Sequence, residues 1–367
     1  MSDTRRSVPL VDLAWQHEQI KEDVLTGWSE VLDKTSFILG PQVAEFESAY
    51  AEFSGVSHCI GVGSGTDALE MALRALEIGP GDEVILPANT FIATALAVTR
   101  VGATPVLVDC DPDFYLIHPE QIEMAIGSKT KAVIPVHLYG QMAPVQEIRD
   151  GFPGLKVIED GAQSQGATRH GASSGSVGHI AATSFYPGKN IGAYGDAGAV
   201  LTSDPDLAKK VKKLRNWGSD VKYHHPEKGF NSRLDTIQAV VLLAKLAKLT
   251  EWNKLRAEAA DRYRDLIDES VLLHPGAMPG NEHVWHLYVT RVDRRDRVLA
   301  RLNESSVGAG IHYPVPIHLQ GAYSDLGKGV GSFPNTERLA NHALSLPMYP
   351  GITAEDQEHV ASRLHEA

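Results

Sequence analysis

Apolar residues between positions 20 and 50 recur three or four residues apart, the spacing of one face of a helix. They are Ile20, Val24, Trp28, Val31, Leu32, Val43, Phe46 and Tyr50. The spacing predicts amphipathic helices after Gln16. The Gly40-Pro41 pair divides the pattern in two, because these residues interrupt regular helices.

From residue 59 onward, short apolar runs alternate with helical patterns. The runs are 59–62, 84–87, 105–109, 132–136, 155–160, 182–185 and 199–202. Strands that alternate with helices form a mostly parallel sheet covered on both faces. The sequence therefore predicts an α/β fold built on a mostly parallel sheet of seven strands.

The pattern changes beyond residue 234. Helical spacing continues to about residue 266, and a strand-like segment (283–290), a helix (298–302) and an extended segment (310–316) follow. We place a domain boundary near Leu249. This predicts a large domain of residues 1–249 and a smaller C-terminal α+β domain of residues 250–367.

Composition narrows the class of protein. The 367 residues carry 34 Lys and Arg against 46 Asp and Glu, and this net charge of −12 argues against a nucleic-acid partner. The first eight residues contain no apolar leader segment, and no apolar run of membrane length follows, so we expect a cytoplasmic protein. Cys59 and Cys110 lie far apart in apolar runs, and the 16 histidines include no H-E-x-x-H motif. We therefore expect neither a disulfide nor a metal site.

Residues 183–198 form the candidate centre of the chemistry. An apolar run leads into this stretch, and four glycines surround its single lysine, Lys189. Glycine lets the backbone approach a ligand closely, and a lysine that loses hydration in a sharp turn becomes nucleophilic. For a lone lysine, a solvated loop position is the commoner arrangement. The neighbouring motifs favour the catalytic interpretation.

A carboxylate marks the end of one predicted strand. Asp160 closes the apolar run 155–160, and Gln163 follows three residues later. Ligands of open α/β sheets bind at the carboxyl ends of strands, whereas a helix cap is the alternative for an isolated aspartate. Asp160 and Lys189 together can bracket a flat heterocycle.

A glycine-rich turn, residues 63–67, precedes a predicted helix. Such a turn presents free N–H groups and the positive end of the helix dipole, which suits an anion. An ordinary tight turn with a Thr or Asp cap has the same pattern, so this motif alone does not decide between the two.

Six ordered motifs spread over nearly the whole chain resemble those of the DegT/DnrJ/StrS sugar aminotransferases. They are residues 63–69, 90–94, 159–163, 184–189, 231–235 and 312–314. The resemblance implies a fold type I enzyme that uses pyridoxal 5′-phosphate (PLP), which cycles through pyridoxamine 5′-phosphate (PMP). Related sugar dehydrases carry histidine in place of Lys189, so this chain looks like a transaminase.

The resemblance implies a set of cofactor-binding residues: Gly65, Thr66, Phe91, Asp160, Gln163, Ser184, Lys189 and Asn231. Lys189 would bind the cofactor covalently and transfer protons, and Asp160 would pair with the ring nitrogen. Phe91 would cover the ring, although plain core packing is an alternative for this side chain.

Other implied contacts involve the ring oxygen, for Gln163, and the phosphate, for Gly65, Thr66 and Ser184. In the family, the asparagine equivalent to Asn231 reaches the phosphate in the neighbouring subunit. This implies a homodimer with shared active sites. A helix-capping role for Asn231 is compatible with it.

Residues 135–141 and 312–320 look most like enzymes that transfer an amino group from L-glutamate to C3 of a dTDP-linked 3-keto-6-deoxyhexose. The candidate substrate contacts are Tyr186, Tyr194, His312, Tyr313 and His318. UDP-linked 3-keto uronic acids, 4-keto sugars and keto-cyclitols are alternative acceptors. A non-catalytic regulator with the same fold is an alternative of another class, although the intact Asp160, Gln163 and Lys189 count against it.

Overall fold

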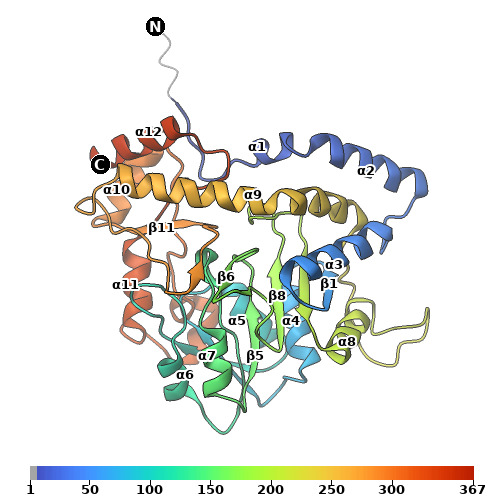
Figure 1. Cartoon of the computed structure of the whole chain (residues 1–367). Coiled ribbons are helices and arrows are strands. Elements are labelled where there is room, and N and C mark those ends of the chain that lie inside the picture. Colours follow the sequence, from blue (N-terminus) through green and yellow to red (C-terminus); the bar gives the residue numbers. More distant parts are fainter. Residues whose placement is uncertain (1–5) are drawn as a thin grey trace.

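The computed structural model describes residues 6–367 (Figure 1). Residues 1–5, part of the segment that lacks an apolar leader pattern, lie outside this range. Among the described residues, no helix combines the length and the apolar character needed to cross a membrane.

A seven-stranded sheet forms the centre of the molecule. Its strands are β1 (His58–Val62), β2 (Glu83–Pro87), β3 (Thr104–Val108), β4 (Thr130–Val133), β5 (Lys156–Asp160), β8 (Ile180–Ser184) and β9 (Gly198–Thr202). Their order is β1-β9-β8-β5-β4-β2-β3, and β9 runs antiparallel to both of its neighbours while the others pair in parallel. The predicted fold class is confirmed, with strand ends shifted by at most three residues.

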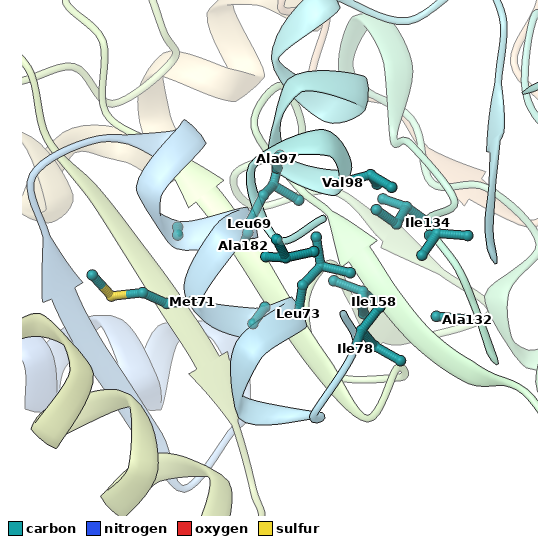
Figure 2. Close-up of a cluster of buried hydrophobic side chains, with 14 of the residues drawn as sticks. Leu69, Met71, Leu73, Ile78, Ala97, Val98, Ala132, Ile134, Ile158 and Ala182 are labelled. Carbon is teal, nitrogen blue, oxygen red and sulfur yellow. The ribbon is translucent and has the colours of Figure 1, made fainter. Parts of the chain in front are cut away.

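Alternate side chains of each strand enter different cores, because successive residues of a strand point to opposite faces. One core contains Ile158 and Ala182 with α4 (Gly65–Ala75), α5 (Ile92–Arg100) and α8 (Pro205–Arg215). Figure 2 shows Leu69 and Leu73 of α4 directed at these sheet residues. The other face packs against α3 (Pro41–Ser54), α6 (Pro119–Ala125) and α7 (Val145–Gly151).

The longest element is α9 (Thr236–Leu266), a helix of 31 residues. It contacts α3 of the large domain and α12 (Ala354–His365) near the C-terminus, and Figure 1 shows it extending across the molecule. The boundary predicted near Leu249 falls inside this helix. The division into residues 1–249 and 250–367 stays a prediction.

The N-terminal segment contains two helices, α1 (Leu13–Glu18) and α2 (Lys21–Lys34), instead of one continuous helix. Ahead of them, Val8 pairs with Val307 in the C-terminal part, and the N–H of Gly308 donates to the carbonyl of Val8 at 2.7 Å. The start of the chain is thereby tied to its C-terminal region.

The C-terminal region packs β11 (Tyr288–Arg291) antiparallel to β12 (Ala343–Leu346). The remaining elements are α10 (Arg295–Glu304), α11 (Pro334–His342), the short strands β6 (Thr168–Arg169), β7 (Ala172–Ser173) and β10 (Asn281–Glu282), and the 3₁₀ turns η1 (Leu138–Gly140), η2 (Ile317–Leu319) and η3 (Gly321–Leu326). The strand predicted over residues 283–290 is wrong in its first half. Trp285 adopts φ 47°, a left-handed conformation that interrupts a strand.

Candidate active site

A cavity of about 510 Å³ lies where the carboxyl ends of β5 and β8 meet the N-terminal ends of α4 and α5. The structure brings ten of the predicted site residues to its wall: Gly65, Thr66, Phe91, Asp160, Gln163, Ser184, Tyr186, Lys189, His312 and Tyr313. The last two come from the segment before η2, so residues more than 240 positions apart in the sequence converge here.

Asp160 ends β5 with its side chain on the α4 and α5 face, and the residue is 4% exposed. One carboxylate oxygen accepts a hydrogen bond from the hydroxyl of Thr94 at 2.8 Å, and the other accepts from the N–H of Ala162 at 3.2 Å. Burial raises the pKa of Asp160, while these two hydrogen bonds and the charge of Lys189 act in the opposite direction. The carboxylate is thus held in place with further acceptor capacity toward the cavity.

Lys189 lies in the turn that follows β8, where its N–H donates to the carbonyl of Tyr186 at 2.9 Å. The turn is so tight that a side chain at Gly192 would collide with the backbone of Pro187. Burial lowers the pKa of Lys189 to about 8, and the negative charge of Asp160 opposes this shift. A much larger fraction of the amine than in an ordinary lysine is therefore neutral near physiological pH and able to accept a proton or attack a carbonyl carbon.

This pKa predicts how the stability of the cofactor-free protein depends on pH. The unfolded chain keeps Lys189 protonated up to about pH 10.4, whereas the folded protein releases the proton near pH 8, so stability rises between these values. Replacing Lys189 with methionine removes the cost of holding the charge. We expect Lys189→Met to raise the unfolding free energy at pH 7 by about 2 kcal/mol, less than the full pKa shift because the amine still reaches cavity water.

Urea unfolding of both proteins at pH 7, 9 and 10.5 measures this difference. It should shrink as the pH rises, because the wild-type lysine becomes neutral in both states. A difference that stays constant over this range would show that packing, and not the charge of Lys189, separates the two proteins.

The start of α4 forms the opposite end of the cavity. The hydroxyl of Ser64 accepts from the N–H of Asp67 at 3.1 Å, while the N–H groups of Gly65 and Thr66 have no acceptors within a helix. A Cβ at position 65 would lie 2.6 Å from the Cβ of Ser184, so only glycine allows this approach. The open N–H groups and the hydroxyl of Ser184 suit a phosphate.

These residues fit PLP. The cavity offers an anion-binding helix start, an anchored carboxylate and a lysine of lowered pKa, and Phe91 is 51% exposed beside them. Each feature matches one part of the cofactor: the phosphate, the ring nitrogen, the aldehyde and the ring face.

Gln163 connects two tyrosines. Its amide oxygen accepts from the N–H of Tyr139 at 2.6 Å, and its amide nitrogen donates to the hydroxyl of Tyr313 at 3.0 Å. The ring of Tyr313 lies 5.3 Å from that of Phe91, and the Tyr139 hydroxyl donates to the carbonyl of His312. Gln163 keeps one N–H for a ligand, so contact with a ring oxygen stays a prediction.

His286 and Thr94 are among the cavity residues that were not predicted as site residues. The amide oxygen of Asn190 faces the Nδ1 of His286 at 3.1 Å, because the Asn190 amide nitrogen donates to Asn253 and Val284. Nδ1 therefore carries the proton, and Nε2 is the acceptor. A histidine inside the strand-like segment 283–290 was the available signal, but the segment was interpreted only as a strand.

Both cavity histidines are neutral at physiological pH. Burial, followed by the charge of Lys189, lowers the pKa of His312 to about 4 and also lowers the pKa of His286. Neither imidazole supplies a positive charge, so they act as neutral hydrogen-bonding groups.

Three predicted residues do not line this cavity. His318 is 2% exposed, bonds to Glu337 at 3.0 Å and packs edge-on against Phe333, so it has no surface to offer a sugar. The hydroxyl of Tyr194 bonds to the Nδ1 of His17 at 2.6 Å. Asn231 is exposed outside the cavity of its own chain, and its action in a partner's cavity stays a prediction.

Comparisons with known proteins agree with this geometry. Residues 18–365 match the family described as the DegT/DnrJ/EryC1/StrS aminotransferase family. The dTDP-3-amino-3,4,6-trideoxy-alpha-D-glucose transaminase of Streptomyces venezuelae is 42% identical over 98% of this chain and 96% of that protein. The UDP-N-acetyl-3-dehydro-alpha-D-glucosamine 3-aminotransferase of Acidithiobacillus ferrooxidans is 45% identical over 97% of this chain and 96% of that protein.

A solved structure is similar over the same length. It is DesV from S. venezuelae in complex with a ketimine intermediate, with a TM-score of 0.95 and 42% identity, covering 98% of both chains. The arrangement of the sheet, the long helix and the C-terminal region is therefore that of a known sugar aminotransferase fold.

Proposed function

The chain belongs to the DegT/DnrJ/EryC1/StrS aminotransferase family of PLP-dependent enzymes, and we propose that it transfers an amino group from L-glutamate to C3 of a dTDP-linked 3-keto-6-deoxyhexose. The transaminase of S. venezuelae bears the name of a dTDP-linked 3-amino deoxysugar, and this supports the nucleotide and the position.

The choice of sugar rests on which side chains line the cavity wall. Leu10, Val11, Phe91 and Leu287 give it apolar surface, and no arginine lines it in the described part of this chain. Arginine is the usual partner of a carboxylate, so the wall is poorly suited to the C6 carboxylate of a uronic acid. The methyl group of a 6-deoxyhexose suits it better.

In this proposal each anchored group has one task. PLP, when bound, supplies the electron sink for the reaction. Lys189 takes a proton from the α-carbon of the donor through its neutral Nζ and returns a proton to C3 of the sugar in the second half-reaction. Asp160 would keep the ring nitrogen protonated, and the N–H groups at the start of α4 would hold the phosphate.

A homodimer with shared active sites is part of the proposal. Apolar side chains stand exposed near Asn231: Ile38 is 51%, Trp217 48% and Tyr223 82% exposed. An exposed patch of this kind typically marks an interface with another protein. Lys222 and Lys228 lie in the same loop as Trp217 and Tyr223 and line the same surface pocket.

Mixing two inactive variants tests whether Asn231 acts in the partner's site. Lys189→Ala and Asn231→Ala homodimers each lack one group at every site. After dissociation and reassociation at equal amounts, we expect about a quarter of wild-type activity, because half of the dimers are mixed and each mixed dimer has one intact site. If Asn231 served its own chain, no mixed site would be intact and no activity would return.

The acceptor is identified most directly by running the half-reaction backwards. The visible absorbance of the PLP-loaded protein is followed while dTDP- and UDP-linked 3-amino and 4-amino sugars are added in turn. We expect a dTDP-linked 3-amino-6-deoxyhexose to remove the visible absorption band of the bound PLP. Response to a UDP-linked 3-amino uronic acid or to a 4-amino sugar would replace the proposed acceptor. If glutamate bleaches the band and none of these amino sugars does, the acceptor would instead be a keto-cyclitol or a sugar outside this set.

We also propose a cytoplasmic location. Cys59 and Cys110 are free and buried, as is usual in reducing compartments. Fractionation of the producing cells, with detection of the protein by antibody, tests this assignment.

A further inference from the structure

Two threonine hydroxyls form a chain that ends at Asp160. The hydroxyl oxygens of Thr90 and Thr94 lie 2.9 Å apart, and that of Thr94 lies 2.8 Å from a carboxylate oxygen of Asp160. Thr90 is 4% and Thr94 is 1% exposed. The chain is therefore shielded from bulk water, where hydrogen bonds of this kind have their largest effect.

The direction of donation along these two hydrogen bonds follows from the charge of Asp160. An ionised carboxylate only accepts, so Thr94 uses its single hydroxyl proton on Asp160. The oxygen of Thr94 then accepts the proton of Thr90. Each hydroxyl in this direction polarises the next, which strengthens the bond to the charged form of Asp160.

We propose that Thr94 is a positioning residue, which fixes the Asp160 carboxylate in the orientation and the ionised state that a protonated ring nitrogen requires, with Thr90 aligning the Thr94 hydroxyl. The inference rests on the proposed role of Asp160 at the ring nitrogen. It adds a residue from the first turn of α5, on a different element from the carboxylate it serves.

Asp160 needs a group that stabilises its ionised form because its carboxylate is buried. The low exposure of Asp160 favours its neutral form, and a neutral carboxyl group cannot balance a positively charged ring. The Ala162 N–H, at 3.2 Å, is a longer contact than the Thr94 hydroxyl, at 2.8 Å. Loss of the hydroxyl would leave the carboxylate with the weaker anchor alone.

Thr94→Val tests the proposal, because valine keeps the shape and removes the hydroxyl. Its dissociation constant for PLP, measured by equilibrium titration of the apoprotein, should rise about tenfold or more, as expected for a lost hydrogen bond to a charged group. The pH below which PLP affinity declines should also move upward, because Asp160 then takes a proton more readily. A purely structural contribution would not move that pH.

Three further variants make the test specific. Thr94→Ser keeps the hydroxyl and should restore both values. Thr99→Val removes a hydroxyl from the same helix, where it contacts backbone carbonyls and Tyr323, and should change neither. Thr90→Val should shift the PLP affinity in the same direction by a smaller factor, and should add nothing in a Thr94→Val background.

Unchanged affinity and pH dependence in Thr94→Val and in Thr90→Val would overturn the proposal, provided that Asp160→Asn loses PLP. If Asp160→Asn also bound PLP normally, the role of Asp160 itself would be wrong, and the proposal would fall with it. Circular dichroism and thermal unfolding of each apoprotein confirm that the variants are folded.

Discussion

Replacing Lys189 with alanine is expected to abolish transamination while the protein remains folded. The amine lies in the cavity wall, and its pKa of about 8 makes it the one cavity group suited to accept a proton from carbon near neutral pH. Its loss removes both the covalent attachment point and the proton carrier. Turnover of glutamate and the keto sugar should fall at least about 10³-fold.

A matched control is available in the same chain. Lys245 of α9 is also buried with a pKa lowered to about 8 by burial, but its amine lies 5.0 Å from the ring centre of Tyr194, outside the cavity. We expect Lys245→Ala to keep transamination even if its stability changes. Normal turnover in Lys189→Ala would contradict the assignment of the active site.

The largest expected effect on stability belongs to Glu159, the neighbour of Asp160 on the opposite face of β5. Its carboxylate accepts from His137 at 2.7 Å and from the N–H groups of Gly175 and Val177 at 2.9 and 2.8 Å. Both members of the His137 pair are fully buried. Glu159→Ala would leave these donors unpaired, at a cost of about 4 kcal/mol in unfolding free energy.

Urea unfolding measures this cost. Glu147→Ala is the control, because Glu147 pairs with Arg169 at 2.7 Å with 43% of its side chain exposed, and such pairs contribute less than about 1 kcal/mol. Equal losses in both variants would show that the His137 pair does not anchor the end of β5.

The pH dependence of the same pair has a definite sign. Burial alone would raise the pKa of Glu159, but the hydrogen bonds from His137 and from the N–H groups of Gly178 and Gly175 hold it below its usual value. The resulting stability is present above the unfolded pKa and disappears as the pH falls through the folded one. The difference between wild type and Glu159→Gln should therefore shrink in acid.

The sheet and most of the residues that line the candidate site could be predicted from the sequence because buried parallel strands are continuous apolar runs. Asp160 and Lys189 each follow such a run, and the carboxyl ends of parallel strands meet at one edge. Asp160 and Lys189 could therefore be identified as candidates from their positions relative to strands that the apolar pattern already predicted.

The sequence-based predictions failed where a contact with a residue distant in the sequence determines the local structure or the partner of a side chain. His318 resembled a ligand residue by its closeness to His312 in the sequence, but Glu337, 19 positions further on, binds its side chain. Residues 283–287 belong to a segment with strand-like composition, yet they follow an irregular path in which His286 contacts Asn190. Neither partner is visible from local spacing.

The continuous helix α9 has a mechanical consequence. It runs from Thr236 to Leu266 without a glycine or proline, the residues at which helices usually bend. Arg256 near its middle donates to the carbonyls of Trp285 and Met348, which fastens the C-terminal region to this rod. These contacts favour movement of the two halves of the chain as one body. We therefore expect loops to admit and enclose the substrate. On substrate binding, exchange of amide protons should slow in the 216–230 loop and stay unchanged in α9.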